Sequence, residues 1–210
     1  MKQKLLLLIL ATSCIASLLN AQKKVSIQVE AGSGYKIYKY ELSNYGQASA
    51  IPYYGRLAIR IGLLEAGGEY SADASSLTYF FEDPNTAEER FTEKHKQSYY
   101  GGFIGINSSK GDKTGMFVRV GAGMNNLTRN TVLTDGRNYS SEKLKAVLEL
   151  KGMAGVAIKL TKILFLNIEG MYGMIMKRKK SDFAADRRTK DSDEFKITSY
   201  GGLMGISVHF

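Results

Sequence analysis

The sequence predicts an all-β chain that folds as an eight-stranded antiparallel up-and-down transmembrane β-barrel. Residues 195–210 alternate apolar residues with small or polar residues, as a strand between lipid and an enclosed polar interior must. Seven further stretches show the same period of two, and short turns alternate with long polar segments between them. Beyond the amino-terminal stretch, no run approaches the ~18 to 20 consecutive apolar residues that a spanning helix needs.

The first three strands are expected around one tight reversal. Residues 25–31 alternate apolar and polar side chains and form the first strand. Residues 38–50 mix Tyr, Ser, Asn and Gly without a steady period, so we expect a loop there. Residues 53–61 and 64–71 alternate again, and a turn at Gly62 joins them.

The next two strands follow a long polar segment. Residues 75–96 contain Pro84 and a cluster of charges, which predicts a loop rather than a strand. A glycine-rich strand follows at 99–106, and residues 108–113 have the composition of a hairpin turn. The fifth strand covers 116–125.

The sixth and seventh strands are the longest. After a loop at 128–142, the sixth strand covers 144–158, with Leu144 on its apolar face and Lys145 on its polar face. A short turn then leads to the seventh strand at 164–177. A charged loop precedes the eighth strand, and an even number of strands places both termini at the same end of a barrel.

Periodicity alone leaves open which face meets lipid, because a soluble lipocalin-like ligand carrier, apolar inside, shows the same alternation. The polar face carries five cations and five anions, and a packed interior tolerates charges only in pairs. Its glycines and serines also suit a narrow interior, so we place lipid on the apolar face. The expected lumen charge network is Glu30, Arg56, Arg60, Glu65, Glu69, Arg119, Lys145, Glu149, Lys151 and Glu169. The expected interfacial aromatic girdles contain Tyr35, Tyr53, Tyr70, Tyr100, Phe165 and Phe210.

The amino terminus predicts export. Residues 1–21 have the charged start and short apolar core of a cleaved signal peptide, which leaves 22–210 as the barrel domain. Acylation at Cys14, as in a lipoprotein, is the alternative. Cys14 is the one cysteine, so a chain cleaved after Ala21 has no thiol. The formal charge is +9, and removal of Lys2 and Lys4 leaves +7, which favours anionic envelope phosphates as partners. Export argues against nucleic acid.

The carboxy-terminal pattern resembles that of the small outer-membrane β-barrel family, the OmpA/OmpX-like and PorT-like barrels of Gram-negative bacteria. The resemblance covers the chain after the signal peptide and implies insertion in the cell outer membrane. It implies an assembly signal that the barrel-assembly machinery reads, made of Tyr200, Met204, Ile206, Val208 and Phe210. Val208 stands where the family usually has an aromatic residue. Members serve as anchors, adhesins, secretion accessories or enzymes, so the resemblance leaves the role open.

No catalytic, cofactor or metal site is expected, because two distant histidines and no thiol do not make a metal shell. We expect a structural or interaction role: adhesion, envelope integrity, or service to an envelope or secretion partner. The alternative is a lipid A-modifying enzyme, for which His95, near Glu93 and Ser98, is the candidate; His209 and Ser207 lie at the opposite rim. The expected contacts with lipopolysaccharide phosphates are Lys177, Arg178, Lys179, Lys180, Arg187 and Arg188.

Overall fold

A computed structural model describes residues 25–41, 47–81, 89–109, 114–133, 138–179 and 194–210, so the predicted signal peptide lies outside the described residues. Nearly all of these residues belong to one antiparallel sheet. Its strands are β1 (Val25–Tyr40), β2 (Gln47–Ala50), β3 (Tyr53–Ile61), β4 (Leu64–Phe81), β5 (Glu89–Asn107), β6 (Gly115–Leu133), β7 (Asn138–Lys143), β8 (Val147–Lys159), β9 (Leu164–Lys179) and β10 (Glu194–His209). In the described part of the chain, no helix is long and apolar enough to cross a membrane.

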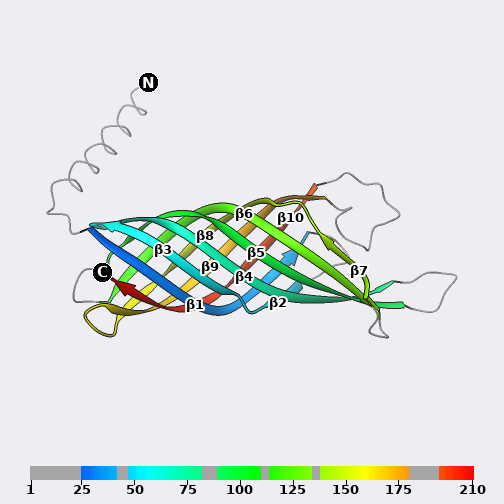
Figure 1. Cartoon of the computed structure of the whole chain (residues 1–210), viewed down its shortest axis with the longest axis horizontal. Helices are drawn as coiled ribbons and strands as arrows, with labels where there is room; N and C mark the ends of the chain where they lie inside the picture. Colours follow the sequence, from blue (N-terminus) through cyan, green and yellow to red (C-terminus); the bar gives the residue numbers. More distant parts are fainter. Residues whose placement is uncertain (1–24, 42–46, 82–88, 110–113, 134–137, 180–193) are drawn as a thin grey trace, which may run out of the picture.

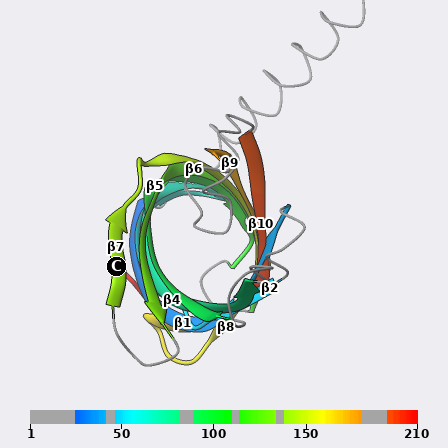
Figure 2. The same ribbon diagram turned by 90° about the vertical axis from the view of Figure 1, so that its right-hand side faces the viewer.

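The sheet closes into a ring with eight strand positions. Each position, called a stave below, is filled by one strand or by two strand segments in line. β2 and β3 form one stave, because both pair with β1 in the same register. β7 and β8 form another along β6, and β10 pairs with β1 to close the ring (Figure 2). Consecutive staves are antiparallel neighbours throughout. The prediction of an eight-stranded antiparallel up-and-down barrel is therefore confirmed.

The ladder also fixes the tilt of the strands. Successive partners around the ring are Val29, Leu57, Gly68, Gly102, Ala122, Leu150, Met174, Thr198 and Lys39. The path leaves β1 at Val29 and returns ten residues further on, at Lys39. With strands ~4.8 Å apart and a rise of ~3.3 Å per residue, a shift of ten over eight staves tilts the strands by about 40°.

The two ends of the ring differ. At one end Ile61 pairs with Leu64 across a two-residue turn, and Gly62 has a φ of 65°, in the left-handed region that glycine favours. Phe210 pairs with Ile27 at the same end through two backbone hydrogen bonds (Figure 1). At the other end β4, β5 and β6 extend furthest. Short turns on one side and long extensions on the other match the asymmetry expected of a membrane barrel.

Alternation along each strand sends apolar side chains outward and charged ones inward. On β6, Val118 is 58% exposed whereas its neighbour Arg119 is 1% exposed, and β8 shows the same contrast between Leu148 and Glu149. A soluble carrier would place its apolar residues inside, so the lipocalin-like alternative is contradicted. This outer face suits acyl chains rather than water.

Six outward tyrosines mark one edge of the apolar face: Tyr35, Tyr53, Tyr70, Tyr100, Tyr172 and Tyr200. Following paired residues once around the barrel shifts the position on β1 by ten residues in eight steps. Residues at the same height along the barrel axis therefore differ from paired residues by about 1.25 residues at each step. With this offset, the six tyrosines lie within roughly 6 Å of one height along the barrel axis. The apolar band between them and Phe210 is about 25 Å tall, the height typical of transmembrane barrels.

Phe165 does not belong to a girdle as the sequence suggested. It points inward, is buried, and stacks on the His209 ring with centroids 4.1 Å apart. Phe165, Asn167 and Glu169 are alternate residues of β9, so their side chains all point inward. Aromatic character alone therefore did not reveal which face this residue occupies.

Three predicted loops are largely strand where the structure describes them. Within 38–50, β1 continues to Tyr40 and β2 covers Gln47–Ala50. β4 and β5 stay paired as far as Phe81 and Glu89, although residues 75–96 were predicted to form a loop. β6 and β7 likewise pair within 128–142, from Thr128 and Lys143 onward. Backbone pairing needs no apolar alternation, and beyond the apolar band both faces of a strand can be polar. Pro84 lies outside the described residues.

Candidate functional site

Buried charged side chains occupy the lumen in several groups that are joined by ion pairs and hydrogen bonds. The members of these groups come from β1, β3, β4, β5, β6, β8 and β9, because each strand directs every second residue inward. The buried cations are Lys36, Arg56, Arg60, Arg119, Arg129, Lys151 and Arg178. The buried carboxylates are Glu30, Glu65, Glu69, Asp73, Glu93, Glu149 and Glu169. Seven positive charges thus face seven negative charges among the described residues.

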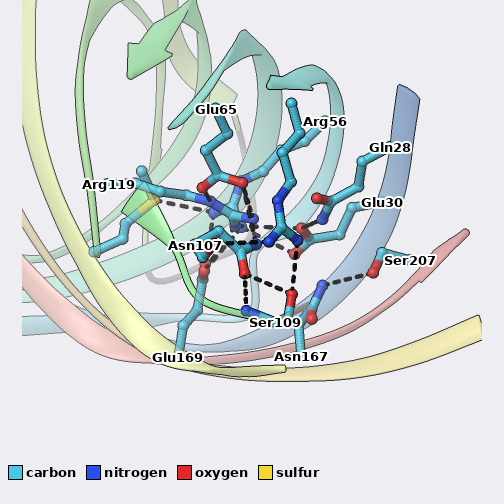
Figure 3. Close-up of polar contacts among 12 residues, drawn as sticks. Gln28, Glu30, Arg56, Glu65, Asn107, Ser109, Arg119, Asn167, Glu169 and Ser207 are labelled. Carbon is cyan, nitrogen blue, oxygen red and sulfur yellow. Dashed lines mark hydrogen bonds and ion pairs between the residues drawn. The ribbon is translucent and has the colours of Figure 1, made fainter. Parts of the chain in front are cut away.

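Arg56 forms the centre of the network. Its Nε donates to Glu69 at 2.7 Å. Its Nη1 donates to Glu30 at 3.0 Å and to Glu169 at 2.9 Å, and Figure 3 labels these two glutamates. Tyr54 lies beside it, with its ring 4.3 Å from the guanidinium carbon, and donates its hydroxyl to Glu30 at 2.9 Å. One guanidinium therefore joins carboxylates from three staves, and charge-assisted bonds of this kind are the strong ones.

Arg119 shares two of these carboxylates. Its Nη1 lies 3.2 Å from Glu30 and 3.4 Å from Glu169, while its Nε donates to Glu65 at 2.6 Å (Figure 3). The ring of Phe117 lies 4.2 Å from its guanidinium carbon. The two arginines and their shared glutamates therefore cross-link opposite walls of the barrel.

Lysines continue the network toward the outer end. Lys151 lies 2.7 Å from Glu69, and its Nζ is 3.4 Å from the centre of the Tyr99 ring. Lys36 lies 3.7 Å from Asp73 and 3.8 Å from Glu149. These contacts place a second layer of paired charge above the arginines.

The end near Gly62 is closed by polar contacts around Arg60. Its Nη1 donates to Ser109 at 3.0 Å, its Nη2 to the Asn107 carbonyl at 2.8 Å, and its Nε to the Gly62 carbonyl at 2.9 Å. His209 lies nearby at this end, 3.1 Å from Ser207. The turns β3–β4 and β5–β6 are therefore tied together from within.

A group of polar side chains around His95 occupies the outer end of the lumen. The Nδ1 of His95 lies 3.0 Å from the Tyr40 hydroxyl, and its Nε2 lies 3.0 Å from Glu93. Arg129 approaches the same carboxylate at 3.9 Å. His95 and Glu93 are fully buried. A hydroxyl, an imidazole and a carboxylate in line resemble a catalytic relay, but the inward orientation keeps them from lipid outside the barrel.

The structure places nine of the ten residues of the expected network in the lumen: Glu30, Arg56, Arg60, Glu65, Glu69, Arg119, Glu149, Lys151 and Glu169. Lys145 is instead exposed, and Leu144 is buried. The reason is a one-residue insertion: Asn125 and Thr128 are three positions apart on β6, whereas their partners Val147 and Lys143 are four positions apart. Such a bulge reverses the side-chain alternation.

Sequence reasoning missed Lys36, Asp73, Glu93, His95, Arg129 and Arg178 as lumen residues. For Lys36 a signal was present, because the inward register that contains Glu30 reaches it after three further steps of two residues. Arg178 was expected to contact lipopolysaccharide. It is instead fully buried and donates to the Lys145 carbonyl at 2.6 Å and to the Asn125 side chain at 3.0 Å. A register shift between β9 and β10 turns it inward.

The other expected lipopolysaccharide contacts are not placed on a surface. Lys177 and Lys179 lie in β9, and their side chains are not described. Lys180, Arg187 and Arg188 lie outside the described residues. The residues of the expected assembly signal lie on the outer face of β10: Tyr200, Met204, Ile206 and Phe210 are exposed and Val208 is half-buried. Their role as a signal stays a prediction.

The packed lumen leaves little room for a solute. Between Arg56, Glu69, Lys151 and Met153 lies a space of about 10 Å³, about enough for one water molecule. Among the described residues, no group of three His, Cys, Asp or Glu side chains could hold a metal ion. The arrangement can therefore lock the walls together, and it blocks the axis of the barrel.

A scan against protein-family models finds no match, and a search of curated proteins finds no relative. Solved structures do match. Neisserial surface protein A aligns with 89% of this chain and 99% of its own, at 14% identity and a TM-score of 0.52. OprG from Pseudomonas aeruginosa (12% identity, TM-score 0.48) covers 90% and 97%, and Ail from Yersinia pestis (12%, 0.47) covers 89% and 99%. The chain thus has the fold of the small outer-membrane β-barrel proteins.

Proposed function

We propose that this protein is an integral outer-membrane anchor whose closed, non-conducting barrel holds outer hairpins for structural or interaction purposes. The observation that carries the proposal is the lumen network, in which seven cations and seven carboxylates fill the axis. A wall cross-linked by buried ion pairs suits rigidity, whereas a diffusion channel needs a continuous aqueous path. No catalysis is part of this proposal.

The outer face supports location in the outer membrane. An apolar band about 25 Å tall, bordered by six tyrosines, fits the hydrocarbon layer that a transmembrane barrel crosses. A barrel also leaves no unpaired sheet edge within that layer, since β1 pairs with both β3 and β10. Cleavage of residues 1–21 during export belongs to the same proposal.

The extended hairpins supply the surface for interaction. β4 and β5 remain paired from Tyr70 and Tyr100 in the girdle to Phe81 and Glu89. This extension covers eleven residues, which rise roughly 27 Å along the barrel axis because the strands are tilted. Paired strands hold recognition residues more rigidly than loops, which suits adhesion, envelope integrity or service to a secretion partner.

A lipid A-modifying enzyme remains the alternative function, because Tyr40, His95 and Glu93 form a hydroxyl–imidazole–carboxylate row. Such an enzyme must bring its nucleophile to a lipid outside the barrel. Here the imidazole is fully buried and points to the axis. The geometry therefore supports the anchor better.

Conductance across a planar lipid bilayer tests the closed lumen. The refolded full-length barrel should insert without stable channel openings at neutral pH, because ion pairs from opposite walls occupy the axis. Insertion is verified independently by protease protection in liposomes and by fractionation of cells with the outer membrane. Long-lived openings with a reproducible conductance would contradict the proposal, as would recovery of the protein in the soluble fraction.

A further inference from the structure

The outer face of the barrel carries a groove of about 1110 Å³ just beyond the tyrosine girdle. Its lining residues come from β1 to β7. Tyr53 and Tyr100 line its end nearest the apolar band, Ala72 and Ser98 line its middle, and Lys96 and Lys143 line its outer part. A closed barrel is convex outside, so a hollow of this size on its wall is a distinctive feature.

Small side chains form the middle of the groove. Ala72 and Ser98 are outward residues on the paired strands β4 and β5, where they directly oppose one another in the ladder. Both are half-buried although they face away from the lumen. The groove therefore has a middle lined by small side chains, between an aromatic end and a cationic end.

Among the residues whose side chains are described, the exposed charges near the groove are nearly all positive. Asp73 also lines the groove, but its carboxylate is buried and lies 3.7 Å from Lys36. Six exposed lysines lie beyond the girdle on the outer face: Lys39, Lys94, Lys96, Lys143, Lys145 and Lys196. Glu41 is the one exposed carboxylate among the residues whose side chains are described, since the others point into the lumen. Neither Lys96 nor Lys143 forms an ion pair with a described carboxylate. Among the described side chains, the carboxylates other than Glu41 thus point into the lumen, and the outer part of the groove carries positive charge.

The height of the groove matches a lipid headgroup. Lys96 lies four residues beyond Tyr100 on β5, which is about 10 Å along the barrel axis. The tyrosines mark the edge of the hydrocarbon layer, and polar headgroups occupy the next ~5 to 8 Å on that side. The flexible lysine side chain can extend back over the remaining few ångströms. A ligand anchored in the outer leaflet would bring its phosphates to the level of the lysines.

We propose that this groove binds a phosphorylated glycolipid of the outer leaflet. Its sugar rings lie against Tyr53 and Tyr100, and its phosphates contact Lys96 and Lys143. A single phosphodiester headgroup would fill only part of such a hollow, whereas a phosphorylated disaccharide has both the bulk for the groove and the charges for its rim. This inference rests on the proposed outer-membrane location, and it assigns the phosphate contacts to β5 and β7 rather than to β9.

Native mass spectrometry of the full-length barrel in detergent micelles tests the site, with purified bisphosphorylated lipid A as the probe. The double variant K96Q/K143Q should bind it about 10- to 30-fold more weakly, since a lysine near an anionic lipid surface contributes ~1 kcal/mol. The matched control K39Q/K196Q removes two exposed lysines that do not line the groove and should bind within about twofold of the parent. Dephosphorylated lipid A should bind all three proteins alike. Heat-modifiable migration in electrophoresis verifies that each variant is folded.

Two results would overturn the proposal. Equal weakening in K96Q/K143Q and K39Q/K196Q would show a diffuse charge effect instead of a site. Groove-dependent binding of phosphatidylglycerol as tight as that of lipid A would assign the groove to an anionic phospholipid. Either result in a protein that fractionates with the outer membrane leaves the anchor function intact, whereas recovery from the soluble fraction would refute that function separately.

Discussion

At the scale of single residues, the lumen shows how a narrow barrel accommodates charge. Arg56 and Arg119 share Glu30 and Glu169, so each carboxylate accepts from two guanidinium groups. Burying a charge is tolerable only when partners replace its water, and removal of one partner leaves an uncompensated charge. The network therefore fixes the relative positions of β1, β3, β6 and β9 more than any single contact would.

Replacement of Arg119 by methionine should lower the free energy of unfolding by about 3 to 5 kcal/mol, because Glu65 loses its 2.6 Å partner in a buried site. Urea titration in detergent, followed by circular dichroism, measures this. The exposed Lys162 provides the control, K162M, which should unfold at the parent's midpoint. Adding E65Q to R119M should restore part of the loss. An R119M protein as resistant to urea as the parent would show that the pair does not stabilise the barrel.

The sequence predicted most of this network because inward residues recur with a period of two. It could not predict which acid binds which base, since Arg56 and Glu169 lie 113 positions apart and meet only through the ring closure. His95 lies in the segment 75–96, for which a loop was predicted, because β5, the strand that turns it inward, has no apolar alternation there. Residue types therefore predicted that charges would pair in the lumen, whereas strand register determines which charged residues lie there.

At the scale of strands, single-residue bulges decide which side chains face inward near the outer rim. One extra residue between β7 and β8 buries Leu144 and exposes Lys145. A shift between β9 and β10 buries Arg178 in the same way. Bulges are common at barrel rims. They have no reliable sequence signature, which is why the regular alternation gave the wrong face for these positions.

Cysteine labelling tests the bulge between β7 and β8. In a Cys14→Ser background, L144C should react slowly with a water-soluble maleimide in the folded protein, because its side chain points into the lumen. K145C should react rapidly, because its side chain is exposed. Both variants should react equally after unfolding in urea. Rapid labelling of L144C with protection of K145C would restore the unbroken alternation and contradict the bulge.

At the scale of the whole molecule, lipid around the barrel explains which strands could be predicted from the sequence and which could not. Within the apolar band the bilayer imposes alternation, so the eight staves and the turn at Gly62 were predictable. Beyond the tyrosines the outer face is not in contact with acyl chains, so apolar and polar residues no longer alternate in the sequence. The extensions of β4 and β5 were therefore predicted to be loops. The outer groove is lined by residues from β1 to β7, which no local sequence pattern brings together.

Single tryptophans provide the most direct test of the central claim, that apolar residues contact lipid and charged residues fill the interior. The chain contains no tryptophan, so V118W and F117W each report on one position alone. In liposomes whose acyl chains carry bromine, V118W fluorescence should be strongly quenched, since Val118 faces outward, and F117W should be nearly unaffected, since Phe117 lies beside Arg119 inside. Strong quenching of F117W with protection of V118W would contradict the account.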